Sequence, residues 1–96
     1  MKDLFRPTQE PARSIYDAFQ KEASKRKECF DLEWILLERV AIFREAWKQA
    51  KKFGYALPSI NLVKEAEKYA SGHADYGAKL AYRLVEIMKE KTSHNV

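Results

Sequence analysis

The sequence predicts an all-α protein, folded as an irregular four-helix bundle in a single domain. Four segments carry apolar residues at helical spacing. The 96 residues include only three glycines and three prolines, which is little material for the turns of a β protein. A chain of this length also supplies one hydrophobic core rather than two.

The helical domain is expected to span residues 11–91, between an extended arm at residues 1–10 and a frayed tail at residues 92–96. Pro11 suits the first turn of a helix, because that position needs no N–H donor. The first helix then carries one narrow apolar stripe and fades in a charged run after it. The stripe consists of Ala12, Ile15, Phe19 and Ala23.

The second helix is expected to begin after Asp31, a good N-cap residue, and to end at Gly54. Its main apolar stripe is Leu32, Leu36, Val40, Phe43, Trp47 and Ala50. Further apolar residues make the first half of the helix apolar nearly all round: Trp34, Ile35, Leu37, Ala41 and Ile42. Such a wide face predicts a helix that is either central or presents a second face to another chain.

Ser59 is expected to cap a third helix, and Asp75 a fourth that reaches about Lys91. Gly72 and Gly77 lie near this junction, and a glycine costs a helix roughly 1 kcal/mol relative to alanine. We therefore predict a hinge in which Gly72 takes a left-handed backbone conformation and closes the third helix. The second and fourth helices have the widest apolar faces, so we expect them to form the centre of the bundle.

Beside Gly72, the hinge also gathers polar side chains that could form a contact site, namely His73, Asp75, Tyr76 and Lys79, and we call these five residues the hinge cluster. The alternative is ordinary capping, in which Asp75 accepts backbone N–H bonds and pairs with Lys79. No histidine and cysteine spacing fits a metal site, and Cys29 with His73 lacks a third orienting group. We expect no metal, no cofactor and no catalytic residue, so the protein is not predicted to be an enzyme.

The charge balance is mildly basic, with 18 basic and 14 acidic residues and a net charge of +4. This permits contact with nucleic acid without requiring it. The residues that could contact phosphates are Lys25, Arg26 and Lys27 at the end of the first helix, and Arg44, Lys48, Lys51 and Lys52 on the second. Cations also favour helix C-termini, so solvated charge is the alternative.

Aromatic side chains are more numerous than the core of such a bundle needs: Trp34, Phe43, Trp47, Tyr69, Tyr76 and Tyr82. They either fill the core or anchor an interface. We expect the second helix to leave a patch uncovered, with Trp34 as its anchor and Leu37 and Ala41 beside it. Closing that patch against a second copy predicts a homodimer.

Two stretches carry a resemblance: Pro11-Ala12-Arg13-Ser14-Ile15-Tyr16 and Gly72-His73-Ala74-Asp75-Tyr76, followed by Lys79. Together they resemble short helical proteins encoded by bacteriophages and prophages. The resemblance implies a small accessory protein that acts by binding in a bacterial cytoplasm, and it carries over no catalytic residue.

The lone Cys29 fits a reducing compartment, and the amino terminus lacks a signal-peptide core. We expect a cytoplasmic protein with no membrane segment and no small-molecule substrate. The sequence therefore predicts a non-catalytic interaction protein that binds itself or another protein. The alternative is a nucleic-acid-binding accessory factor that uses the two basic groups.

Overall fold

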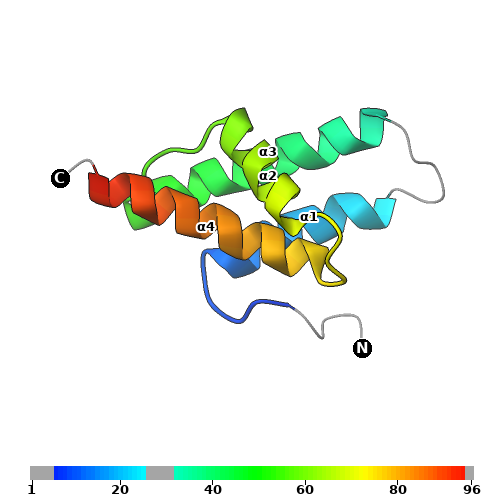
Figure 1. Cartoon of the computed structure of the whole chain (residues 1–96), viewed down its shortest axis with the longest axis horizontal. Coiled ribbons are helices and arrows are strands. Elements are labelled where there is room, and N and C mark those ends of the chain that lie inside the picture. The colour runs from blue at the N-terminus through cyan, green and yellow to red at the C-terminus, as the bar shows by residue number, and fades with distance from the viewer. Residues whose placement is uncertain (1–5, 26–31, 95–96) are drawn as a thin grey trace.

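The computed structural model describes residues 6–25 and 32–94, which form four α-helices and no strand (Figure 1). This confirms the predicted all-α, four-helix class. The expected capping residue Asp31 lies outside the described residues. The helices are α1 (Ala12–Lys25), α2 (Leu32–Phe53), α3 (Ile60–Ala70) and α4 (Tyr76–His94).

The segment before α1 is held against that helix. The Arg6 guanidinium donates two hydrogen bonds to the Asp17 carboxylate, at 2.9 and 2.7 Å, and Pro7 is fully buried. The Glu10 carboxylate accepts the Ser14 backbone N–H at 3.0 Å, which satisfies a donor of the first helical turn. Hydrogen bonds from Ser14, with a contribution from Arg13, lower the pKa of the Glu10 carboxyl. Residues 6–10 lack helix, as predicted, but they are anchored.

The end of α2 and the start of α3 lie where local sequence signals predict them. Gly54 has φ +75°, and the Tyr55 N–H donates to the Ala50 carbonyl at 2.9 Å, which is the wide turn that commonly ends a helix. The Ser59 side chain accepts the Leu62 N–H at 3.3 Å as the N-cap of α3. These boundaries confirm the predicted stop and start.

The connector between α2 and α3 is fastened to the far end of α4. The Ala56 N–H donates to the Thr92 hydroxyl oxygen at 2.5 Å, and that hydroxyl donates to the Met88 carbonyl at 2.7 Å. Helix α4 consequently runs three residues past its expected end at Lys91, to His94. Thr92 belongs to the packed domain rather than to a frayed tail.

Helix α3 ends in a tight turn at Ala70–His73. Ser71 has φ −56° and ψ 133°, Gly72 has φ +86°, and the His73 N–H donates to the Ala70 carbonyl at 3.1 Å. These values describe a type II turn with Gly72 at its third position, where a positive φ is required. The predicted left-handed glycine is confirmed, and it occupies a β-turn that follows the helix.

Gly72→Val is expected to lower the free energy of unfolding by about 1–3 kcal/mol, the cost of a β-branched residue at positive φ. A side chain at Gly72 would meet no atom within 4 Å, so the cost comes from the backbone alone. Urea unfolding of this variant and of Ser71→Val measures it, because valine at Ser71 keeps an ordinary negative φ. Equal stability of the two variants would contradict the assignment.

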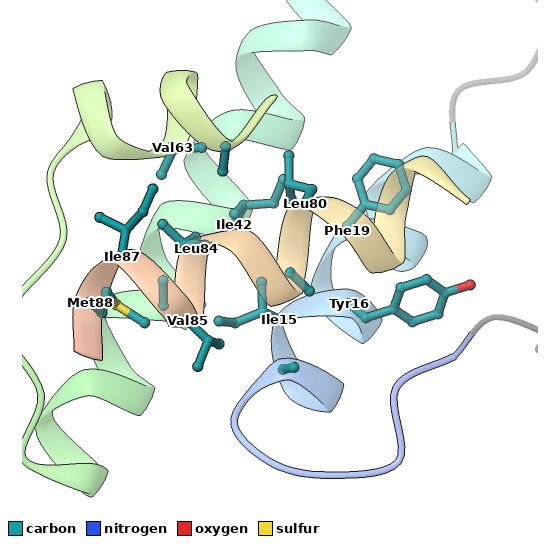
Figure 2. Close-up of a cluster of buried hydrophobic side chains, with 14 of the residues drawn as sticks. Ile15, Tyr16, Phe19, Ile42, Val63, Leu80, Leu84, Val85, Ile87 and Met88 are labelled. Atoms are coloured by element: carbon teal, nitrogen blue, oxygen red, sulfur yellow. The ribbon is translucent and has the colours of Figure 1, made fainter. Parts of the chain in front are cut away.

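The core centres on α4, which packs mainly against α3 and α1 (Figure 1). Its buried side chains meet Ile15, Tyr16 and Phe19 from α1, Ile42 from α2 and Val63 from α3 in one cluster (Figure 2). Helix α2 packs mainly on α1 and α3 and touches α4 little. The expectation that α2 and α4 together form the centre is therefore wrong for α2. The buried residues of α4 are Ala78, Leu80, Ala81, Leu84, Val85, Ile87 and Met88.

Gly77 lies inside α4 and does not interrupt it. A Cβ atom at this position would come within 3.0 Å of ring atoms of Phe19 and Tyr16. The residue is therefore a close-approach glycine, which lets the start of α4 cross the rings of α1. The fourth helix was predicted to begin after Asp75, so Gly77 lies in its first turn as expected, and the packing of two aromatic rings against it offsets its low helix propensity.

An ion pair joins α2 to α3 at the edge of the core. The Arg39 guanidinium donates to both carboxylate oxygens of Glu67, at 2.8 to 3.2 Å. Both side chains are only 18% exposed, and the hydrogen bonds from this pair raise the pKa of Arg39. Such two-point geometry fixes the rotation of α2 about its axis more firmly than a single contact does.

Candidate interaction surfaces

Helix α2 leaves several large apolar side chains in solvent, including Phe53 at its end. The other four share one side of the helix, and we call them the α2 face: Leu36 (52% exposed), Leu37 (48%), Val40 (40%) and Trp47 (38%). Their spacing places them along one side of the helix over about 17 Å. Isolated exposed apolar residues are common, but four along one helix face form a patch of a few hundred Å². Patches of this size often mark binding sites.

The rotation of α2 differs from the sequence prediction. Of the stripe expected to face the core, Leu36, Val40 and Trp47 are exposed, Phe43 is partly buried and Ala50 is fully buried; the side chain of Leu32 lies outside the description. Ile42 and Ala46 are buried instead: Ile42 fills the core, and the small Ala46 side chain lets α2 approach its neighbours closely. Of the predicted interface residues, Leu37 is exposed, whereas Trp34 and Ala41 are partly buried. Trp34 is thus not the centre of the exposed patch.

The four cations predicted on α2 are all exposed, and among the described residues none forms a salt bridge: Arg44, Lys48, Lys51 and Lys52. The Lys51 ammonium lies 4.7 Å from the centre of the Trp47 ring, so the cations border the α2 face directly. Arg44 and Lys48 also line an open groove of about 570 Å³ between α1 and α2, which contains both acidic and basic residues.

The structure describes only one residue of the other predicted basic group, Lys25. Lys25 ends α1 and pairs with Glu22 at 3.4 Å. Arg26 and Lys27 lie outside the described residues. The structure therefore brings the basic residues of α2 together on one surface but gives no position for most of the first group.

The hinge cluster separates into two groups. The exposed His73 ring stacks on Tyr69 at a centroid distance of 6.3 Å, while the Tyr76 ring packs on Phe19 at 5.6 Å. Asp75 immediately precedes α4, and its backbone carbonyl accepts the Lys79 N–H at 3.0 Å. Asp75 and Lys79 form no salt bridge in the described structure, so the expected pairing is absent. The five residues do not converge on a shared site.

A second surface was not predicted from the sequence. Between α3 and α4 lies an open groove of about 380 Å³, which we call the tyrosine groove; its lining is Tyr69, Lys79, Tyr82, Arg83, Val85, Glu86 and Lys89. Tyr69 and Tyr82 are 53% and 52% exposed, which is high for such large rings. The surplus of aromatic residues was the only sequence signal for them.

Cations surround the two tyrosines. The Arg83 guanidinium lies 5.2 Å from the centre of the Tyr69 ring and also donates to Glu86 at 2.7 Å, and this bond raises the pKa of Arg83. Lys79 and Lys89 line the same groove without forming a salt bridge among the described residues. The groove therefore combines two half-exposed tyrosines with the ammonium groups of Lys79 and Lys89, which no described carboxylate neutralises.

The described residues contain no group of three histidine, cysteine, aspartate or glutamate side chains that could hold a metal ion. Cys29 lies outside them. None of the described helices combines the length and the apolar character that crossing a bilayer requires.

Comparison with known protein families, with curated proteins and with solved structures gives no match to this chain. The resemblance to phage-encoded proteins stays a prediction from two short motifs.

Proposed function

We propose that this protein acts by protein–protein binding and that its α2 face joins two copies of the chain in a homodimer. The main support for this proposal is the α2 face itself, whose four apolar side chains are each 38 to 52% exposed: Leu36, Leu37, Val40 and Trp47. None of these four side chains is charged, so a second apolar helix can cover them without burying a carboxylate. A second copy supplies such a helix by symmetry.

The charges on α2 favour an antiparallel arrangement of the two helices. Arg44, Lys48, Lys51 and Lys52 all lie in the C-terminal half, beside or beyond the α2 face. A parallel pair would bring eight cations together, which is unfavourable at close range. In an antiparallel pair the two sets of four lie at opposite ends of the interface, and the two-fold axis passes near Val40.

The size of the patch predicts a weak dimer. A standard stable interface buries about 800 Å² on each partner, whereas the α2 face offers a few hundred Å² of apolar surface. Flanking groups such as the partly buried Phe43 enlarge the contact only at its rim. We therefore expect a dissociation constant on the order of micromolar, which corresponds to about 8 kcal/mol of binding free energy.

Leu36→Glu is expected to weaken the dimer at least tenfold, because association would bury a carboxylate on each side of the axis. Leucine and glutamate have similar helix propensities, so α2 itself should persist. Sedimentation or light scattering over concentrations from about 1 µM to about 1 mM, spanning the expected constant, measures the change. Circular dichroism checks that the variant is helical.

Leu57→Glu is the matched control. Leu57 is 50% exposed, against 52% for Leu36, but it lies in the connector between α2 and α3. The control should dimerise like the unmodified chain. A single-chain mass for the unmodified protein throughout the concentration range would overturn the proposal, and equal weakening by both variants would show that the α2 face is not the interface.

The cations of α2 support nucleic-acid binding as a second candidate. None of Arg44, Lys48, Lys51 and Lys52 is neutralised by a described carboxylate, so each could meet a phosphate. A phosphate backbone that followed them would also approach Leu36 and Val40, and these aliphatic side chains have no partner on a phosphate chain. A protein partner satisfies both parts of this surface, and for this reason self-association stands first.

A further inference from the structure

We propose that the tyrosine groove between α3 and α4 binds single-stranded nucleic acid. In this site unpaired bases stack on Tyr69 and Tyr82, and backbone phosphates pair with Lys79 and Lys89. The site is separate from the α2 face, and the proposal does not depend on dimerisation.

The two tyrosine rings are placed as a stacking platform. Both are about half exposed and line one groove, although they come from different helices. Neighbours hold Tyr69: the Arg83 guanidinium lies 5.2 Å from its centre, and the His73 ring stacks on it at an interplanar angle of 28°. A ring held in this way loses little freedom when a base packs against its exposed surface, which is 53% of the residue. Tyrosine faces accept any base, because every base has a π-face.

The cations lie where the backbone of a stacked strand would pass. Lys79 and Lys89 line the groove on α4 and are ten positions apart, which is about 15 Å along the helix. Neither forms a salt bridge with a described residue, and the Lys89 ammonium lies 6.0 Å from the Tyr55 ring. Arg83 is shared between Tyr69 and Glu86, so it orients a ring rather than offering a full charge.

The floor of the groove discriminates against a protein partner. Among the residues that line it, Val85 alone is aliphatic, and Val85 is only 7% exposed. A second hollow, of about 290 Å³, shares Tyr69 and Arg83 with the groove and is also lined by Glu65 and Lys68. An apolar helix would find few contacts here, in contrast to the α2 face. Flat rings between ammonium groups match the alternation of bases and phosphates.

A single strand fits this chemistry better than a duplex. In a duplex the base faces are stacked on each other, so tyrosine side chains cannot reach them without opening the helix. The tyrosine groove should therefore bind an unpaired strand more tightly than the same sequence in duplex form.

Fluorescence anisotropy tests the proposal with a fluorescein-labelled oligothymidylate of about 15 nucleotides at low salt, a length within the usual range of single-strand sites. Tyr82→Ala is expected to weaken binding roughly 5- to 100-fold, the loss of one stacked base. Tyr82→Phe keeps the ring and should bind almost as well as the unmodified protein. Equal loss in both variants would mean that the hydroxyl rather than the ring face is used, and would overturn the stacking.

The cations are tested by the salt dependence. The double variant Lys79→Gln, Lys89→Gln removes two phosphate contacts. The negative slope of log affinity against log salt concentration should therefore become less steep by about 1.4, which is about 0.7 for each single-strand contact. The matched control is Lys48→Gln, Lys52→Gln on α2, which removes the same charge from another exposed surface. If the control makes the slope less steep and the groove variant does not, the strand binds α2 and the proposal fails. Absence of binding at low salt also overturns it.

Discussion

Leu84→Ala is expected to lower the free energy of unfolding by about 3–4 kcal/mol, within the range seen when a buried leucine leaves a cavity. Leu84 is fully buried in α4, in the cluster where α1, α2 and α3 meet it (Figure 2). Three helices border the site, so no single side chain can move in to fill the space. A domain of this size has a stability of only about 5–10 kcal/mol, and the variant should lose a large part of it.

Urea unfolding followed by circular dichroism measures this loss. Tyr82→Ala is the control, because Tyr82 lies half a turn away on the same helix but is 52% exposed. Its cost should stay below about 1 kcal/mol, as for surface substitutions away from special contacts. This also establishes that the variant used for the tyrosine groove is folded. A Leu84→Ala cost as small as that of the control would mean that α4 is not at the centre.

Gly77→Val is expected to lower the free energy of unfolding by about 3 kcal/mol, the upper part of the range for overpacking. The added Cβ atom would lie 3.0 Å from ring atoms of Phe19 and Tyr16, and valine adds two methyl groups beyond it. Either the rings move from their positions in the core or α4 moves away from α1. Gly77→Ala should cost less, because its gain of about 1 kcal/mol in helix propensity offsets part of the contact.

A double-mutant cycle identifies the contact responsible. Phe19→Leu removes ring atoms that oppose Gly77, so Gly77→Val should be less destabilising in that background than in the unmodified chain. Strict additivity of the two changes would show that the clash lies elsewhere. Gly72→Val provides a further contrast, since its expected cost arises from backbone conformation and is independent of Phe19.

Local signals in the sequence predicted the helix ends well. Gly54 ends α2, Ser59 caps α3 and Gly72 adopts a positive φ, because each position depends on a few neighbouring backbone groups. The end of α4 was placed too early, since Thr92 is fixed by a hydrogen bond from Ala56 in a distant connector. Contacts between remote segments leave no mark in local composition.

The rotation of α2 could not be predicted, for a different reason. Its first half is apolar nearly all round, so hydrophobic periodicity gives no preferred direction. Packing decides it: Ile42 and Ala46 fit against α1 and α3, and the Arg39–Glu67 pair fixes the angle, which leaves Leu36 and Trp47 in solvent. The tyrosine groove was missed because Tyr69 and Tyr82 belong to different helices and meet only in the fold.

The central position of α4 has a consequence for how the chain folds as it is synthesised. Helices α1, α2 and α3 precede α4 in sequence, so a ribosome makes all three before the element that their buried side chains cover. An α1–α2 hairpin can form early, but Ile15 and Ile42 remain without Leu80 and Leu84 until α4 emerges. Cooperative folding of this domain therefore waits for the synthesis of α4, and the nascent chain exposes apolar surface to chaperones until then.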